Sequence, residues 1–262
     1  MQNNPHAEPS KVSSYTIAML RACCPRWSPS GYFDKVTLGP ADPILGLSVA
    51  FNADKHPDKV NLGVGVYRGD DGKPFVLECV KRVSDKAMGS NLEYAPITGV
   101  ASFVERAQGL AFADVPALRE KRIASSQSLS GTGALRVAAD FLTRFAPSKK
   151  IIVPNPTWGN HLNVFRDSGL DVGRYAYYDA SRNALDFGGL MKDLNAASEH
   201  TIVLLHACAH NPTGIDPTVE QWHEIVDTIR RKKLFPFVDM AYQGFASGDL
   251  DRDAFATRLI AK

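Results

Sequence analysis

Three short apolar runs constrain the fold of this chain more than any other feature of its 262 residues. The runs are Ile151–Val153, Thr201–Leu205 and Phe235–Val238, and none of them contains a charged residue. Strands with one face in solvent alternate polar and apolar residues, whereas uninterrupted apolar strands are buried on both faces, which is typical of parallel sheets. The runs therefore predict strands inside a sheet that helices cover.

Helical patterns separate these runs. Apolar residues recur at helical spacing in two sets, Leu135, Ala138, Ala139 and Leu142, then Trp222, Ile225, Val226 and Ile229. The second set follows Thr218-x-x-Gln221, a capping-box signature for a helix start. A further helix is predicted over Asp251–Lys262. The alternation predicts an α/β fold in which helices sandwich a mostly parallel sheet.

Composition excludes several classes of protein. Lys+Arg 30 against Asp+Glu 28 gives a net charge of +2, so a strongly basic nucleic-acid binder is not expected. The longest apolar run is far shorter than the roughly 18 residues of a membrane span. The four cysteines are too few and too scattered for a disulfide-built fold, which favours reduced thiols.

Residues 1–29 differ in composition from the rest of the chain. They contain Lys11, Arg21 and Arg26 against a single acid, Glu8, together with several serines. A short amphipathic helix over Tyr15–Cys24 fits this pattern. This composition fits either a mitochondrial transit peptide or a disordered tail.

Ligands of open α/β sheets bind beyond the carboxyl ends of the strands, so the residues there are the candidates for chemistry. Ser130-Gly131-Thr132-Gly133-Ala134 opens a helix. Its small residues expose backbone N–H groups, and the helix dipole favours an anion by about 0.3–1 kcal/mol. The alternative is a plain glycine-rich turn. A Walker loop and a dinucleotide fingerprint are both excluded, because neither Gly-Lys-Ser/Thr nor a third glycine follows.

Two further strand ends carry polar or aromatic residues. Trp158 follows the first run and either offers its face to a planar ligand or packs in the core. Asp239 ends the third run, where a carboxylate costs several kcal/mol unless a cation or hydrogen-bond donors meet it. Tyr242 lies three residues later and reaches the same space. Asp239 is therefore expected to have a partner, either in the protein or in a ligand.

The segment after the second run, His206-Ala-Cys208-Ala-His210-Asn211-Pro-Thr-Gly, has two interpretations. If the strand continues, positions 206, 208 and 210 share one face and suggest zinc. Three ligands on one strand without a fourth make a poor tetrahedral set, so no metal site is predicted. In the other interpretation these are core residues, and the turn sets Asn211 over the sheet edge.

These strand ends together resemble those of the aspartate aminotransferases, fold-type I enzymes that use pyridoxal 5'-phosphate. Four segments carry the resemblance, in chain order: Ser130-Gly-Thr-Gly-Ala, Pro156-Thr-Trp-Gly-Asn-His, His206-Ala-Cys-Ala-His-Asn-Pro-Thr-Gly and Asp239-Met-Ala-Tyr-Gln-Gly-Phe-Ala-Ser-Gly-Asp. Three upstream segments match as well: Asp42-Pro-Ile-Leu-Gly, Val60-Asn-Leu-Gly-Val-Gly-Val-Tyr-Arg and Leu92-Glu-Tyr-Ala-Pro-Ile-Thr-Gly. The resemblance runs from about residue 30 to the last residue. It is closest to the mitochondrial form around Gly39-Pro, which favours a transit peptide over residues 1–29 and the mitochondrial matrix over the cytoplasm.

The resemblance implies a role for each candidate residue. Ser130, Gly131 and Thr132 would hold the cofactor phosphate, Trp158 would stack on the pyridine ring, and Asp239 would pair with the ring nitrogen, a charged hydrogen bond worth roughly 1.5–3 kcal/mol.

The remaining roles follow from the same resemblance. Asn211 and Tyr242 would form hydrogen bonds to the phenolic oxygen of the ring. His161 would support Asp239 without touching the cofactor. Tyr94 would reach the cofactor phosphate of a partner subunit, which implies a homodimer. The residues implied in substrate binding are Gly65, Trp158 and Asn211.

The resemblance also implies a reaction and a division into domains. The family moves an amino group from aspartate to 2-oxoglutarate, giving oxaloacetate and glutamate, so amino acids and 2-oxo acids are the expected partners. Residues 1–29 would be the leader or tail and 30–74 an N-terminal arm with part of the small domain. Residues 75–262 would form an incomplete cofactor-binding large domain.

One part of the family pattern does not occur in these residues. The imine-forming lysine of the family, in Ser-x-Ser-Lys-Asn, and the arginines that bind substrate carboxylates have no counterpart up to Lys262. No catalytic residue is therefore assigned. We expect a C-terminally truncated enzyme that is inactive alone. The alternative is a non-catalytic isoform that binds cofactor weakly or pairs with a full-length subunit.

Overall fold

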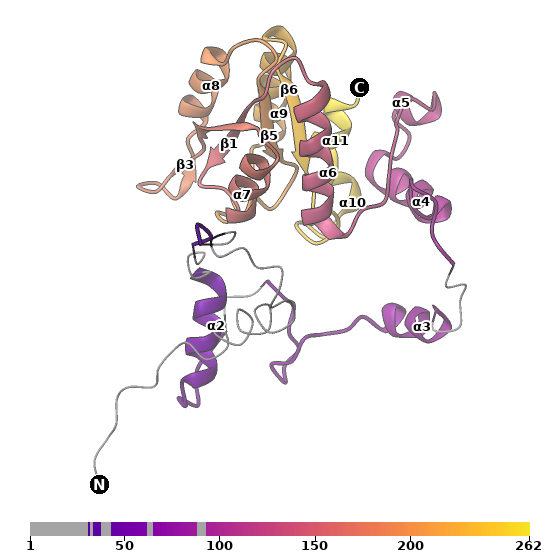
Figure 1. Ribbon diagram of the computed structural model, residues 1–262, viewed down its shortest axis with the longest axis vertical. Helices are drawn as coiled ribbons and strands as arrows, with labels where there is room; N and C mark the ends of the chain where they lie inside the picture. The colour runs from indigo at the N-terminus through magenta and orange to yellow at the C-terminus, as the bar shows by residue number, and fades with distance from the viewer. Residues whose placement is uncertain (1–30, 32–33, 38–42, 62–64, 88–92) are drawn as a thin grey trace. The chain divides into compact units, whose positions relative to one another are not determined.

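The computed structural model describes residues 31, 34–37, 43–61, 65–87 and 93–262 (Figure 1). The chain divides into two compact units, Met1–Asn91 and Leu92–Lys262. The predicted helix at Tyr15–Cys24 and the rest of residues 1–29 lie outside the described residues. The domain boundary expected between residues 74 and 75 stays a prediction.

The first unit contains helices α2 (Pro43–Ala53) and α3 (Glu78–Ala87) and a bridge between Arg68 and Pro74. None of the side chains that the structure describes in this unit is buried. Its described residues therefore build no core of their own.

The second unit contains all the strands among the described residues and the remaining helices. In chain order these are α4 (Ala101–Phe112), α5 (Pro116–Arg119), α6 (Ser130–Phe145), β1 (Lys150–Asn155), α7 (Gly159–Asp167), β2 (Asp171–Ala176), β3 (Tyr178–Asp179), β4 (Ala184–Leu185), α8 (Phe187–Ala196), β5 (Ile202–His206), α9 (Val219–Arg231), β6 (Phe235–Asp239), α10 (Leu250–Asp253) and α11 (Phe255–Ile260).

A parallel sheet with strand order β2-β1-β5-β6 forms the centre of this unit. The three apolar runs are its strands β1, β5 and β6, which confirms the sequence prediction. Every residue of β5 is buried, because helices cover both sides. A separate antiparallel pair, β3 and β4, lies beyond β2 in the chain.

Alternate residues of the strands supply two cores on opposite faces of the sheet. Ile151, Val153, Ile202 and Leu204 pack with α6 and α7. On the other face Ile152, Val203 and Leu205 pack with α8, α9 and Ala256 of α11. Helices therefore sandwich the sheet, as predicted.

Local signals explain where the helices begin and end. Helix α9 begins at the predicted capping box, in which Thr218 and Gln221 exchange hydrogen bonds between side chain and backbone. The single helix predicted over Asp251–Lys262 is wrong, because two short helices separated at Ala254 replace it.

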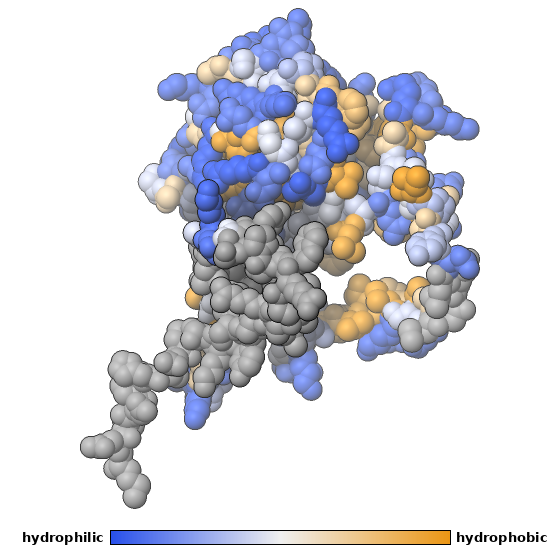
Figure 2. All heavy atoms as spheres, viewed as in Figure 1, coloured by the Kyte–Doolittle hydropathy of each residue, from blue (hydrophilic) through white to orange (hydrophobic). Residues whose placement is uncertain are grey.

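One side of α6 is apolar and open to solvent. Val137, Phe141 and Phe145 follow at four-residue spacing and are more than half exposed, and the two phenylalanine rings lie 4.9 Å apart. The space-filling view shows apolar side chains at the surface of this unit (Figure 2). No described helix combines the length and apolar character needed to cross a membrane.

Candidate active site

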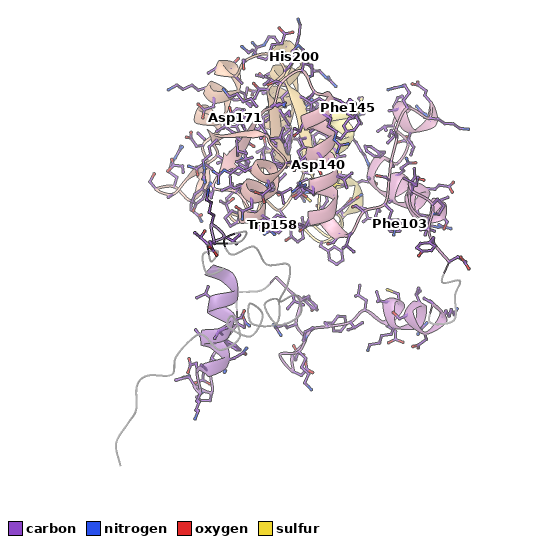
Figure 3. All side chains as sticks on the ribbon, in the orientation of Figure 1. Phe103, Asp140, Phe145, Trp158, Asp171 and His200 are labelled. Carbon is purple, nitrogen blue, oxygen red and sulfur yellow. The ribbon has the colours of Figure 1, made fainter. Side chains whose placement is uncertain are left out.

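The carboxyl ends of the strands bring together most of the predicted site residues. Asp239 ends β6 and pairs in register with His206, which ends β5. Trp158 lies three residues beyond the end of β1 and begins α7 as its N-cap. In Figure 3, Trp158 lies at the opposite end of the sheet from Asp171 and His200, which are near the starts of β2 and β5.

Helix α6 presents its N-terminus at this same end of the sheet. It ends at Phe145 and β1 begins at Lys150, so the chain turns back and the helix runs antiparallel to the strand. The helix has 16 residues and rises about 24 Å, close to the about 20 Å of the six-residue strand. The glycine-rich turn at Gly131 therefore lies level with the strand ends.

A chain of hydrogen bonds holds Asp239. Its Oδ2 lies 2.9 Å from His161 Nε2, and His161 Nδ1 lies 2.8 Å from Thr157 Oγ1. His161 is fully buried, whereas the Asp239 side chain keeps 26% of its surface exposed. Burial raises the pKa of Asp239, but the hydrogen bond and charge of His161 lower it by more, so the pKa lies below its usual value. Asp239 is therefore an ionised carboxylate with one exposed side.

A row of aromatic rings leads away from this carboxylate; the first pair meets edge to face and the next two pairs are stacked. The His161 and His206 rings are 5.1 Å apart, those of His206 and His210 4.4 Å, and those of His210 and Tyr177 3.9 Å. Burial lowers the pKa of His206 to about 4 and that of His210 to about 3, which keeps both rings neutral.

The zinc interpretation of this segment has no geometric basis. Strand β5 ends at His206, so positions 206, 208 and 210 do not continue along one strand face. Among the described residues, no group of three histidine, cysteine or acidic side chains is arranged to hold a metal ion.

The loops that follow β5 and β6 carry Asn211 and Tyr242. His206 Nδ1 accepts the backbone N–H of Asn211 at 3.1 Å, which ties this half-buried residue to the strand end. The Tyr242 backbone N–H interacts with the thiol of the buried Cys208, and its side chain is 42% exposed.

The first turn of α6 consists of exposed backbone. Ser130, Gly131 and Thr132 are all exposed, and no side chain caps the helix. The first N–H groups of a helix have no partner within it, so an uncapped N-terminus suits an anion. A Cβ added at Gly131 would meet no atom within 4 Å, which leaves the space beside the turn open.

For two further predicted residues the structure gives only the exposure. The Tyr94 side chain is fully exposed. Gly65 is an exposed residue of the first unit, so its role at the substrate carboxylate stays a prediction.

Sequence reasoning missed two residues that the geometry adds. Thr157 is the second partner of His161, and its position four residues before His161 near a helix start was the available signal. Asp216 accepts the backbone N–H groups of Ala209 and His210 at 2.6 and 2.9 Å.

Comparison with known proteins defines the class. Residues 57–262 match the family described as aminotransferase class I and II. The chain belongs to this family.

The relatives give the comparison more detail. The chain is 51% identical over 236 residues to the mitochondrial aspartate aminotransferase of Dictyostelium discoideum, covering 89% of this chain and 55% of the relative. It is 52% identical over 234 residues to a cytoplasmic aspartate aminotransferase of Oryza sativa subsp. japonica, covering 88% and 58%. The chain thus spans just over half the length of these relatives, which come from more than one compartment.

Solved structures support the fold. The aromatic-amino-acid aminotransferase of Burkholderia pseudomallei, covalently bound to pyridoxal phosphate, superposes with a TM-score of 0.84 at 44% identity. The superposition covers 88% of this chain and 58% of that one. The fold is that of the fold-type I aminotransferases, in partial form.

Proposed function

We propose that this chain carries the cofactor-binding part of an aspartate aminotransferase and binds pyridoxal 5'-phosphate at the carboxyl ends of β1, β5 and β6. One observation carries the proposal: an ionised carboxylate, Asp239, lies at the same sheet end as an uncapped helix N-terminus. A protonated ring nitrogen and a phosphate need these two partners.

The residues fit the cofactor at both ends. Backbone N–H groups of Ser130, Gly131 and Thr132 would receive the phosphate, because no side chain occupies their place. His161 binds only Oδ2 of Asp239, and within the described part of the chain Oδ1 accepts no hydrogen bond. Oδ1 would accept the ring N–H. Trp158 is half-buried at this sheet end and would cover one face of the ring.

The protein residues would orient the ring of the cofactor and stabilise the charges on its nitrogen and its phenolic oxygen. Pyridoxal phosphate supplies an electron-accepting ring when bound. Asp239 would keep a proton on the ring nitrogen, because an ionised carboxylate within hydrogen-bond reach favours the charged form. Asn211 and Tyr242 would donate hydrogen bonds to the phenolic oxygen and stabilise its negative charge.

The substrates are proposed from the relatives. Relatives that are 51% and 52% identical to this chain are named aspartate aminotransferases. Aspartate and 2-oxoglutarate are therefore the proposed substrates. Gly65, Trp158 and Asn211 would border the substrate. The full exposure of Tyr94 supports a role across a homodimer, where it would reach the partner subunit's cofactor.

The 262 residues alone are proposed to bind the cofactor without turnover, since no lysine or arginine among them is assigned to catalysis. Titrating the purified chain with pyridoxal phosphate, followed by fluorescence, should show saturable binding of one molecule per chain. Inorganic phosphate should compete. Absence of saturable binding would overturn the proposed site.

A second arm tests the reaction. The chain fused in frame to the carboxyl-terminal remainder of the Dictyostelium discoideum relative should convert aspartate and 2-oxoglutarate into oxaloacetate and glutamate. Residues 1–262 alone should not. Steady turnover by the 262 residues contradicts the proposed inactivity, and a folded fusion without this activity contradicts the substrate assignment.

The mitochondrial matrix is the proposed location. The support is the basic, serine-containing composition of residues 1–29. A fluorescent protein fused to these residues should enter mitochondria, and the same fusion with Arg21 and Arg26 changed to Glu should stay in the cytoplasm. Cytoplasmic fluorescence from the unmodified fusion contradicts the proposal.

A further inference from the structure

A buried carboxylate outside the predicted site faces the loop that follows β6. Asp253 ends α10 and is only 3% exposed. Burying an ionised carboxylate is costly unless hydrogen-bond donors surround it, so its donors indicate what it holds in place.

The donors of Asp253 all belong to one loop. Its Oδ2 accepts the backbone N–H of Gly244 at 2.8 Å and that of Ser247 at 3.3 Å. The Ser247 hydroxyl and the Ala246 N–H also favour the charged carboxylate, although their own hydrogen bonds go to the carbonyls of Asp249 and Tyr242, at 3.4 and 3.1 Å. Burial raises the pKa of Asp253, but these donors lower it by more, so the group is a carboxylate at neutral pH.

The loop held by Asp253 also holds Tyr242. The carbonyl of Tyr242 accepts the N–H of Phe245 at 2.9 Å and that of Ala246 at 3.1 Å. Gly244 has a φ of +84°, and a Cβ there would lie 2.6 Å from Leu250 Cδ2. The turn is therefore tight, and a shift at residues 244–247 passes to Tyr242 through two hydrogen bonds.

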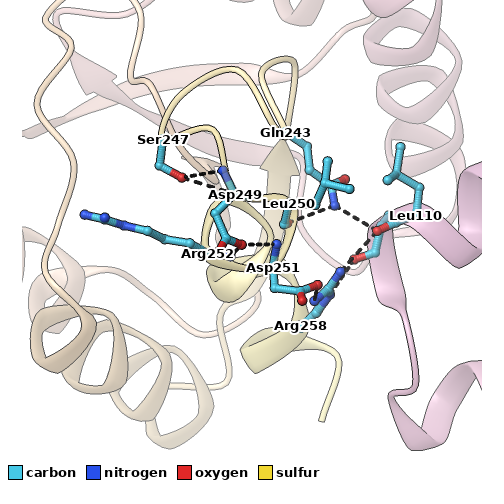
Figure 4. A network of polar contacts seen from close by, with 9 residues as sticks. Leu110, Gln243, Ser247, Asp249, Leu250, Asp251, Arg252 and Arg258 are labelled. Carbon is cyan, nitrogen blue, oxygen red and sulfur yellow. Dashed lines mark hydrogen bonds and ion pairs between the residues drawn. The ribbon is translucent and has the colours of Figure 1, made fainter.

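The neighbouring residue Gln243 anchors the loop to the distant helix α4 and to α10, which follows the loop. Gln243 Nε2 donates to the carbonyls of Leu110 and Leu250, at 2.8 and 3.1 Å. Arg258 reaches the same Leu110 carbonyl (Figure 4). Gln243 thus ties the loop to α4 and α10, and Asp253 holds residues 244–247, so the backbone at Tyr242 is held on both sides.

We propose that Asp253 is a positioning residue: it holds the backbone of residues 244–247 so that Tyr242 meets the phenolic oxygen of the cofactor. The inference rests on the proposed function for the role of the Tyr242 hydroxyl. The geometry of the loop itself does not depend on that function.

The first experiment measures the pKa of the phenolic group of bound pyridoxal phosphate by absorbance against pH. Tyr242→Phe should raise this pKa and weaken binding about fivefold, because one hydrogen-bond donor is lost. Asp253→Asn should shift both values in the same direction. In the double variant the second change should add almost nothing, because both act through one hydroxyl.

Two further variants separate positioning from folding. Asp253→Glu keeps the charge and should restore the pKa of the bound cofactor in part. Ser247→Ala removes an exposed hydroxyl that favours the Asp253 carboxylate and exchanges hydrogen bonds with the Asp249 backbone in the same loop. It should therefore show a smaller effect of the same sign even if Asp253→Asn fails to fold. Asp227→Asn, at an exposed carboxylate of α9, is the matched control and should change nothing. Additive effects of Tyr242→Phe and Asp253→Asn, or no pKa change with Ser247→Ala, overturn the proposal.

The second experiment needs no cofactor and uses amide hydrogen exchange. Asp253→Asn, or Ser247→Ala in its place, should speed exchange at Gly244 and Ser247 and also at Tyr242. Faster exchange at Gly244 and Ser247 with an unchanged Tyr242 rejects the positioning role. If the unmodified chain does not bind pyridoxal phosphate, the proposed function fails while this second experiment still decides the role of Asp253.

Discussion

The two ends of the candidate site are built in different ways: the ring end around Asp239, and the phosphate end at Ser130, Gly131 and Thr132. At the ring end, Asp239 is held by a fully buried histidine, which is itself bonded to Thr157 and packed against a stack of neutral rings. At the proposed phosphate end, the first turn of α6 is exposed and no side chain caps it. The ring end is therefore organised before a ligand arrives, whereas the phosphate end depends on helix backbone and dipole.

This difference has a physical consequence for substitutions. A preorganised carboxylate depends on side chains from several loops, so changes there alter stability, charge and binding together. A helix N-terminus depends on backbone, so a side chain added there acts on binding without disturbing the core. The predictions below use this contrast.

The largest expected effect is acid sensitivity of the ring end. His206 and His210 have pKa values of about 4 and about 3 when folded, below the about 6.5 of an unfolded histidine. The unfolded chain therefore binds more protons below pH 6.5. Each residue removes about 1.4 kcal/mol of stability per pH unit as the pH falls from there toward the folded value.

Urea unfolding at about pH 7 and about pH 5 measures this loss. His210→Phe keeps a ring in the stack without a titrating group, so the pH dependence should fall by about half. His223→Phe, at an exposed position of α9, is the control and should leave it unchanged. An equal change in the free energy of unfolding between the two pH values, in His210→Phe and in the unmodified chain, contradicts the prediction.

The next effect concerns the carboxylate. Asp239→Ala should weaken binding of pyridoxal phosphate by roughly 1.5–3 kcal/mol, because a charged hydrogen bond is lost. Fluorescence titration measures the affinity. Asp171→Ala, at the opposite end of the sheet, should bind normally. Similar losses in both variants would point to a general effect on folding instead of a site.

The smallest effect separates binding from stability at the phosphate end. Gly131→Asp places a negative charge at a helix N-terminus with open space around it, so stability should rise by about 0.3–1 kcal/mol. Binding of inorganic phosphate should fall, since the new charge repels it. Gly188→Asp in the first turn of α8 is the matched control, because its Cβ also meets open space. Unchanged phosphate binding in Gly131→Asp contradicts an anion site at α6.

The same contrast describes what the sequence could predict. The strands follow from uninterrupted apolar runs, and the start of α9 follows from its capping box, because both signals are local. Asp239 could be predicted as a strand-end carboxylate in need of a partner. The glycine turn at Gly131 is equally local.

The contacts within the ring end could not be predicted in this way. His161 and Asp239 are 78 residues apart, and the resemblance to a family, not the spacing, suggested their contact. Asp253 is one of several acids in its segment, and only the folded loop shows which carboxylate is buried. The break at Ala254 has the same origin, since residues of α10 bond the loop after β6 instead of continuing one helix.

The protonation state of the ring nitrogen tests the central claim most directly. Pyridoxal phosphate labelled with ¹⁵N in the ring, bound to the chain at neutral pH, should give the NMR shift of a protonated pyridine nitrogen. Asp239→Ala should return that shift to the unprotonated value. An unprotonated nitrogen in the unmodified chain, or a shift that does not respond to Asp239→Ala, would contradict the account.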